Sequence, residues 1–424
     1  MKYNLEDKPG PGAFILYGLQ WWAVCLPCVI IMGVVVARLH YSDLGGQVFY
    51  LQKLFGLTGL VLAAQLVFGH KLPLVVGPAT ILLAGMLAAL SSGIDVLYSS
   101  IAIGGALLTL LSAAGLIGKL RNFFTPRIVC VILALIAFTI SPTILSLTLG
   151  DGQKAAFHLF FGFGLTLVMI ITNQFLTGIW KSMTVLLDLA GGSLVYFVLT
   201  AFPVLPAIPP APNSGLLIEK FVFDPGAALA FALCMLALTI NELGSIESIG
   251  HMLRADQMDR RVKRGVTVMG LGNAAAGLMG VLGPVSYSLS AGIIAATGCA
   301  ARLSLLPAAA GLVLCAFVPQ AVLICSLLPG PVMGALMLYL MAAQLASGLS
   351  LLVSERAVSD FGSALTVGFP LMGGLLISFV PGSAFQDLPS LIRPVVSNGF
   401  VIGTLLVILL EHVIIRPSRP NSAD

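Results

Sequence analysis

Long apolar runs, separated by short polar stretches, fill almost the whole chain. A run of about 20 apolar residues is long enough to cross a membrane as a helix. The pattern therefore predicts an all-α polytopic membrane protein with fourteen segments. We place these segments at residues 13–37, 49–68, 73–91, 97–117, 128–148, 155–177, 182–203, 225–249, 265–282, 284–298, 303–327, 330–350, 360–380 and 395–415.

The third and tenth segments each contain a Gly-Pro pair within a similar phrase. Residues 75–80 read VVGPAT and residues 281–286 read VLGPVS, with the two prolines 206 positions apart (284 − 78 = 206). A Gly-Pro pair frees backbone N–H and C=O groups, and at membrane depth these are tolerated only where they are covered by protein or line a cavity. Corresponding breaks in two halves indicate the substrate site of a secondary transporter. The alternative is a pair of ordinary helix kinks and a chance match.

The position of the two breaks divides the chain into seven segments plus seven. An odd number of segments turns the second half over, so the repeat must be inverted. We expect residues 1–203 to form the first repeat and residues 225–415 the second. Residues 204–224 would then form an extracellular linker, and residues 416–424 a cytoplasmic tail.

Composition and charge agree with this topology. The chain is 58% hydrophobic and only 9% charged, with a mean hydropathy of +1.05, whereas soluble domains carry about 25% charged residues. With a cytoplasmic N-terminus, 16 of the 21 Lys and Arg residues fall in inner loops or tails, as the positive-inside rule requires. We therefore expect an inner-membrane protein with both termini in the cytoplasm. The net charge of +4 needs no nucleic-acid partner. The basic residues left outside are Arg38, Lys53, Lys154, Lys220 and Arg393.

The eighth segment carries the densest set of polar residues at membrane depth. Ionisable residues are costly there and are functional candidates by default. Glu242 and Glu247 are five residues apart, about 140° around a helix, so they should not face one pocket together. Residues 241, 245 and 248 share one helix face, and Glu247 lies towards its edge. We expect one carboxylate to meet the substrate and the other to join an interhelical hydrogen-bond network. The alternative is an interfacial helix end.

Six motifs in order give the chain a resemblance to the nucleobase–ascorbate transporters (nucleobase:cation symporter-2, or uracil/xanthine permeases). The Gln20-Trp21 pair resembles the family's Gln-His motif, and SIESIG resembles its acidic eighth-segment motif, in which a carboxylate binds the base. The motifs lie at residues 16–21, 72–78, 123–129, 245–250, 291–302 and 329–335.

This resemblance implies a particular fold. A core domain would comprise residues 13–117 and 225–327, and a gate domain residues 128–203 and 330–415. Short extended pieces of the two broken segments would pair at the centre. A half-helix would then start after each piece, with its N-terminal N–H groups facing the substrate. We also expect a homodimer formed through the gate domains.

The side chains expected around the substrate depart from the family pattern. Trp21 stands where the family usually has histidine, and Leu289-Ser290 stand where it has Glu or Gln followed by Asn. Ala79 and Thr80 replace a small–aromatic pair. An apolar pair thus replaces a polar one, so we expect a substrate that is less polar or differently substituted than uracil. Alternatively, Trp21 stacks on the ring and Ser288 or Ser290 supplies the missing hydrogen bond.

The resemblance implies proton-coupled nucleobase uptake by an elevator-like motion of the core against the gate. Glu247 would bind the base and take part in proton coupling, with Glu242 as a second proton site. We expect no cofactor beyond the coupling ion, a proton. One alternative is a transporter of organic or inorganic anions with the same fold, although Glu247 would repel an anion. Another is a membrane enzyme or sensor, but no catalytic set, metal-ligand spacing or phosphate loop stands out in the sequence.

Overall fold

The structure, a computed structural model, describes most of the 424 residues of the chain. The described residues are 2–89, 92–117, 125–150, 152, 154–177, 180–181, 183–203, 207, 215–287, 290–389 and 392–415. The predicted tail at 416–424 and residues 204–206 and 208–214 of the predicted linker at 204–224 therefore lie outside the described residues.

Eight helices of this part of the chain are long and apolar enough to cross a membrane, or nine if a bent pair is counted as one. They correspond to eight of the fourteen predicted segments, and the all-α polytopic fold is confirmed. The helices are α1 (Pro11–His40), α2 (Leu44–Val67), α4 (Ile94–Ala113), α6 (Pro126–Leu149), α7 (Ala155–Phe175), α10 (Pro225–Met252), α15 (Gly330–Ser354) and α16 (Phe361–Phe379).

Four further predicted segments form helices that are short, charged or bent. The eleventh, predicted as one span, divides into α13 (Leu306–Ala316) and α14 (Pro319–Ser326) with a bend of 86°. Pro319 causes the break, because it lacks an N–H and disfavours a helical conformation at Val318. Segments seven and nine are α9 (Thr184–Thr200) and α11 (Met258–Met279), and segment fourteen is α17 (Arg393–Val396), α18 (Gly399–Leu409) and the π-helical η4 (Leu410–Ile414).

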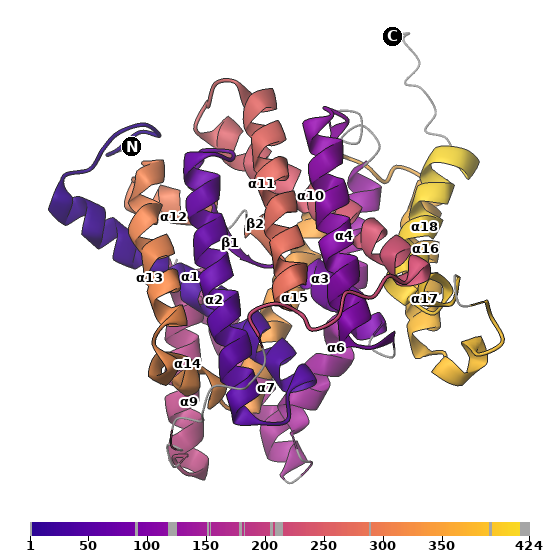
Figure 1. The fold of residues 1–424 in the computed structure, drawn as a ribbon, viewed down its shortest axis with the longest axis horizontal. Helices are drawn as coiled ribbons and strands as arrows, with labels where there is room; N and C mark the ends of the chain where they lie inside the picture. The colour runs from indigo at the N-terminus through magenta and orange to yellow at the C-terminus, as the bar shows by residue number, and fades with distance from the viewer. Residues whose placement is uncertain are drawn as a thin grey trace.

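The third and tenth segments are broken, as predicted. Each begins with a four-residue strand, β1 (Val75–Pro78) or β2 (Pro284–Tyr287), and continues as a short helix, α3 (Thr80–Ala88) or α12 (Ser290–Thr297). The strands pair antiparallel, with Pro78 opposite Pro284. Figure 1 shows this ribbon at the centre of the molecule, between helices from both halves of the chain. The extended pieces therefore satisfy each other's backbone groups at membrane depth.

The helices pack mainly within two groups. In the first, which we call the core group, α4 packs along α11 and α10, and α2 packs against α1 and α13. In the second, the gate group, α15 packs against α6 and α7, and α16 against α18. Figure 1 shows α16–α18 on one side of the molecule and α13 on the other. The division of the chain into core and gate domains, and their motion against each other, stays a prediction.

Glycines allow the closest contact within the core group. A Cβ on Gly277 of α11 would overlap the backbone of Ala102 and Tyr98 in α4. A Cβ on Gly105 of α4 would overlap the backbone of Ala274 in the same way. Small residues let membrane helices approach closely where lipid offers no hydrophobic driving force. The α4–α11 pair therefore forms a rigid wall beside α10.

Candidate substrate site

A large cavity lies between the core and gate groups. Its volume is about 760 Å³, within the range of roughly 300–1,000 Å³ typical of small-molecule sites. Helix α10 contributes the polar wall, and α6 and α15 contribute the opposite, mostly apolar wall. The first turn of α3 reaches the cavity through Ile81. The cavity therefore adjoins the break in the third segment.

The polar wall is the helix face expected from residue spacing. Asn241, Ser245, Glu247 and Ser248 all line the cavity. Glu247 is half-buried, whereas Glu242, five residues earlier, is fully buried and points elsewhere. The two carboxylates thus occupy different environments, as their angular separation requires.

Glu242 belongs to a buried hydrogen-bond network that holds β2. Its Oε2 accepts the backbone N–H of Ser286 at 2.7 Å, and its Oε1 accepts the Ser286 hydroxyl at 2.9 Å. Gln65 Nε2 donates to the same Oε1 at 3.3 Å. Ser245 of α10 donates to the Ser286 carbonyl at 3.0 Å. The second broken segment is therefore fastened to the helix that carries Glu247.

His70 extends this network on the side of the first repeat. Its Nδ1 accepts the backbone N–H of Leu72 at 3.0 Å, so Nε2 carries the proton of the neutral ring. That Nε2 faces the hydroxyl of Ser286 at 3.5 Å. Sequence reasoning missed His70, which lies between two predicted segments, and Gln65, which lies inside the second one, because both are far along the chain from Glu242. The available signal was the position of His70 just before the broken third segment.

Three other predicted site residues, Thr80, Ala79 and Trp21, lie outside the lining of the cavity. Thr80 donates to Gln344 Oε1 of α15 at 3.4 Å, so it lies at the contact between core and gate. Ala79 is fully buried, and its N–H donates to the Gly283 carbonyl at 2.8 Å. Trp21 is 1% exposed. Direct contact of these three residues with a substrate stays a prediction.

Of the tenth-segment candidates, Ser290 lies within the described residues. Ser290 is fully buried, and its hydroxyl accepts the Val75 N–H at 2.9 Å and donates to the Tyr287 carbonyl at 3.2 Å. It thus ties α12 to both strands. Ser288 and Leu289 lie outside the described residues.

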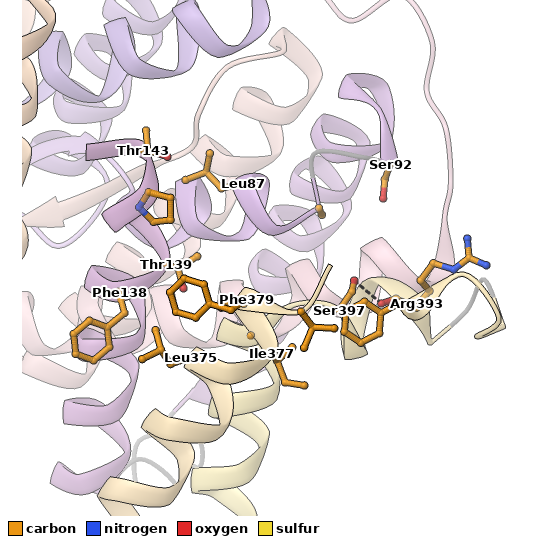
Figure 2. A pocket seen from close by; sticks show the side chains of 16 residues that line it. Leu87, Ser92, Phe138, Thr139, Thr143, Leu375, Ile377, Phe379, Arg393 and Ser397 are labelled. Atoms are coloured by element: carbon orange, nitrogen blue, oxygen red, sulfur yellow. Dashed lines mark hydrogen bonds between the residues drawn. The ribbon is translucent and has the colours of Figure 1, made fainter. Parts of the chain in front are cut away.

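A second cavity lies at the other end of α3. It measures about 450 Å³ and is lined by the C-terminal end of α3, the middle of α6, the end of α16 and the segment that follows α16. Figure 2 shows Thr139 and Thr143 of α6 near Leu87 of α3, with Arg393 and Ser397 at the far end from Phe138. The first cavity touches α6 at residues 126–133 and the second at residues 138–143. Helices α3 and α6 therefore separate two cavities along one helix–helix contact.

Solved structures define the class of fold. The transmembrane domain of the cyanobacterial bicarbonate transporter BicA matches with a TM-score of 0.62 at 15% identity, over 94% of this chain and 96% of that one. Murine Slc26a9, an anion transporter in the inward-facing state, matches with a TM-score of 0.61 at 13% identity, over 96% and 69%. The fold is that of a polytopic membrane transporter.

Sequence comparison then identifies the family. The model of the Permease family matches residues 12–383, and the chain belongs to that family. Among relatives, uric acid permease PucK of Bacillus subtilis is 29% identical over 381 residues, 84% of each chain. Nucleobase transporter PlUacP of Paenibacillus larvae is 26% identical over 82% of this chain and 81% of its own. The chain is therefore a multi-pass membrane permease, and the prediction that it is not an enzyme is confirmed.

Proposed function

We propose that the protein is a proton-coupled importer of a nucleobase, such as uracil, xanthine or a related purine or pyrimidine, in the inner membrane. The names of the relatives, which include uric acid, xanthine and nucleobase permeases, support this substrate class. The observation that carries the proposal is the half-buried carboxylate of Glu247 in a cavity of about 760 Å³ beside the broken helices.

Recognition would combine one acceptor with a set of donors. The Glu247 carboxylate accepts hydrogen bonds from ring N–H groups, and Asn241 and Ser248 on the same wall add adaptable partners. The N-terminal end of α3, which starts at Thr80, offers N–H groups and a positive dipole end to ring carbonyl oxygens. The remaining proposed residues (Trp21, Ala79, Ser288, Leu289 and Ser290) would shape the site around the paired strands. An anionic substrate is disfavoured, because Glu247 would repel it.

Transport would follow from relative motion of the two helix groups. The two cavities, at opposite ends of α3 and at different levels of α6, support alternating access. In this proposal, the core group carries Glu247 and the paired strands past α6 and α15 in an elevator-like movement. Proton coupling would reside at Glu247, with Glu242 as the second candidate, and no further cofactor is required.

Orientation and assembly complete the proposal. The basic loop between α10 and α11 lies at the same edge of the molecule as the N-terminal end and the end of the last helix (Figure 1), so positive-inside topology supports cytoplasmic termini. Gate helices α7, α15 and α16 leave most of their apolar surface exposed. That surface supports lipid contact and a homodimer through the gate groups.

Uptake of radiolabelled bases by cells expressing the protein tests the function. Uptake of uracil, xanthine, hypoxanthine or urate that rises with an inward proton gradient is expected from the wild type. Glu247→Gln should lower coupled uptake by about 100-fold, because it replaces one carboxylate oxygen with an N–H donor and removes the proton site. Glu219→Gln, which changes an exposed carboxylate outside the cavity lining, serves as the matched control. Wild-type coupled uptake by Glu247→Gln, or uptake of bicarbonate or sulfate instead of a base, would contradict the proposal.

A further inference from the structure

Glu247 also lines a separate cavity on the other side of α10. This cavity, which we call the rear cavity, measures about 460 Å³ and lies among α4, α10 and α11. Glu247 and Leu243 are the residues that line both this cavity and the substrate cavity. They therefore form the wall between the two spaces.

The rear cavity has a charged, exposed mouth and a buried inner end. His251 at the end of α10, together with Asp259 and Lys263 of α11, lines the mouth, and all three are exposed. Ser112, Ile117 and Leu243 line the inner end and are buried. The Ser112 hydroxyl donates to the Lys263 carbonyl at 2.9 Å and accepts from Thr267 at 2.9 Å. The charged, exposed groups at its mouth and the buried hydroxyl of Ser112 offer partners to water.

The walls of the rear cavity come from the core group alone. The substrate cavity, in contrast, needs α6 and α15 of the gate group to complete it. A molecule bound in the substrate cavity would therefore leave the rear cavity open. Relative motion of the two helix groups would carry the rear cavity as a unit with Glu247.

We infer that the rear cavity is a proton pathway between Glu247 and the cytoplasm, distinct from the route of the substrate. The inference rests on the proposed function. Water in the cavity takes the proton from the Glu247 carboxyl group, leaving the carboxylate, and passes it to the bulk through the titratable mouth. Movement of the core group away from the cytoplasm carries this mouth into the apolar layer and closes the pathway.

The charged groups around Glu247 divide between the two spaces. His251 from α10 and Asp259 and Lys263 from α11 face the rear cavity, α4 contributes the hydroxyl of Ser112, and Glu355 from α15 lies on the substrate side. Exposed titratable groups thus lie on both sides of Glu247, but Glu355 shares its cavity with the bound base. A pathway on this side lets the proton leave while the base is still bound.

Two assays in proteoliposomes separate proton release from substrate movement. Net uptake driven by a pH gradient requires deprotonation of the carrier in every cycle. Exchange of labelled for unlabelled base at equal pH does not, because the carrier can shuttle with its proton bound. Loss of the proton pathway must therefore abolish the first and spare the second.

Filling or neutralising the rear cavity provides the test variants. Val262→Trp places a bulky side chain in the cavity and obstructs it, and Asp259→Asn combined with Lys263→Met removes charge from its mouth. Leu271→Trp, at an exposed position on the same helix, is the matched control. We expect gradient-driven uptake to fall about tenfold or more in both rear-cavity variants, with exchange close to wild type.

Several results would overturn the inference. Unchanged gradient-driven uptake in both variants shows that the proton leaves by another route. Equal loss of exchange and net uptake in both variants shows that the rear cavity serves substrate movement or packing. A wild type without gradient-driven uptake of any base removes the proposed function as well, so the two failures are distinguishable.

Discussion

The two broken segments share a backbone design but differ in how they are fastened. The first break, at β1 and α3, is apolar. The side chains that hydrogen-bond to its strand come from the other repeat. Ser290 accepts the Val75 N–H, and the Tyr287 hydroxyl donates to the Pro78 carbonyl. The second, at β2, is tied to the helices around it by Glu242, Ser245 and Asn273. Polar side chains thus hold the second break to the surrounding helices, and the first break is held by pairing with the second.

This difference places the chemistry on one side of an otherwise symmetric centre. Glu242 and Ser245 lie on α10, the helix that presents Glu247 to the substrate cavity. Strand β2 and the proposed proton site are therefore parts of one rigid unit. The first break contributes the N-terminus of α3 and the contact from Thr80 to the gate group. The two halves of the inverted repeat therefore contribute different groups to the site.

Among substitutions that test this difference, Glu242→Leu should have the largest effect on stability. The substitution leaves the Ser286 N–H, the Ser286 hydroxyl and Gln65 Nε2 without their buried acceptor. Because each unpaired buried donor costs about 1–3 kcal/mol, we expect the free energy of unfolding in detergent to fall by about 4 kcal/mol. Glu242→Gln, which keeps an acceptor, should recover most of it. If Glu242→Leu unfolds like the wild type, the anchoring role is wrong.

The two glycines of the repeated phrase offer an intermediate test. A Cβ on Gly283 would overlap the side chain of Asn273, which is fully buried and bonded to Pro284 and Met269 carbonyls. A Cβ on Gly77 meets the ring edge of Tyr287, which is only half-buried and can shift. Overpacking typically costs about 1–3 kcal/mol, so Gly283→Ala should lie near the top of that range and Gly77→Ala near the bottom. Thermal unfolding of both variants in one detergent gives the order, and the reverse order contradicts the comparison.

The smallest effect is expected at Ser290. Ser290→Ala removes the acceptor for the buried Val75 N–H, and we expect a loss of about 1 kcal/mol in the stability of the ribbon. Hydrogen exchange at the Val75 amide measures it directly, since local opening exposes that group. Exchange should speed up there while amides of α4 and α11 keep wild-type rates. Uniform acceleration would indicate global destabilisation instead.

Much of the fold could be predicted from the sequence, because the bilayer restricts it to helices that satisfy their own backbone groups. Apolar runs located all fourteen segments, and the repeated Gly-Pro phrase located both breaks. The residue spacing in α10 separated Glu242 from Glu247. The bend in segment eleven was missed, because a proline inside an apolar run fits either a kinked or a divided helix. The strand register could not be predicted either, because no local sequence feature distinguishes one pairing of two Val/Gly-rich segments from another.

The partners of the polar residues were the least predictable part of the site. Ser286 lies 44 residues from Glu242, and Gln65 lies 177 residues away. Only the packing of α2, α10 and β2 brings these side chains together. Thr80 likewise contacts Gln344, which is 264 residues distant. Spacing along one helix predicts which side chains share a face, but not what that face meets.

The pairing of Pro78 with Pro284 relates the two strands of the ribbon by a local two-fold axis. The two prolines occupy the same position of the repeated phrase, so this residue meets its own counterpart across the ribbon. Such self-pairing is the hallmark of an isologous contact between two-fold related subunits. The ribbon therefore has the two-fold symmetry of a homodimer interface, although both of its strands belong to one chain. Two half-length polypeptides inserted in opposite orientations would meet through this same contact.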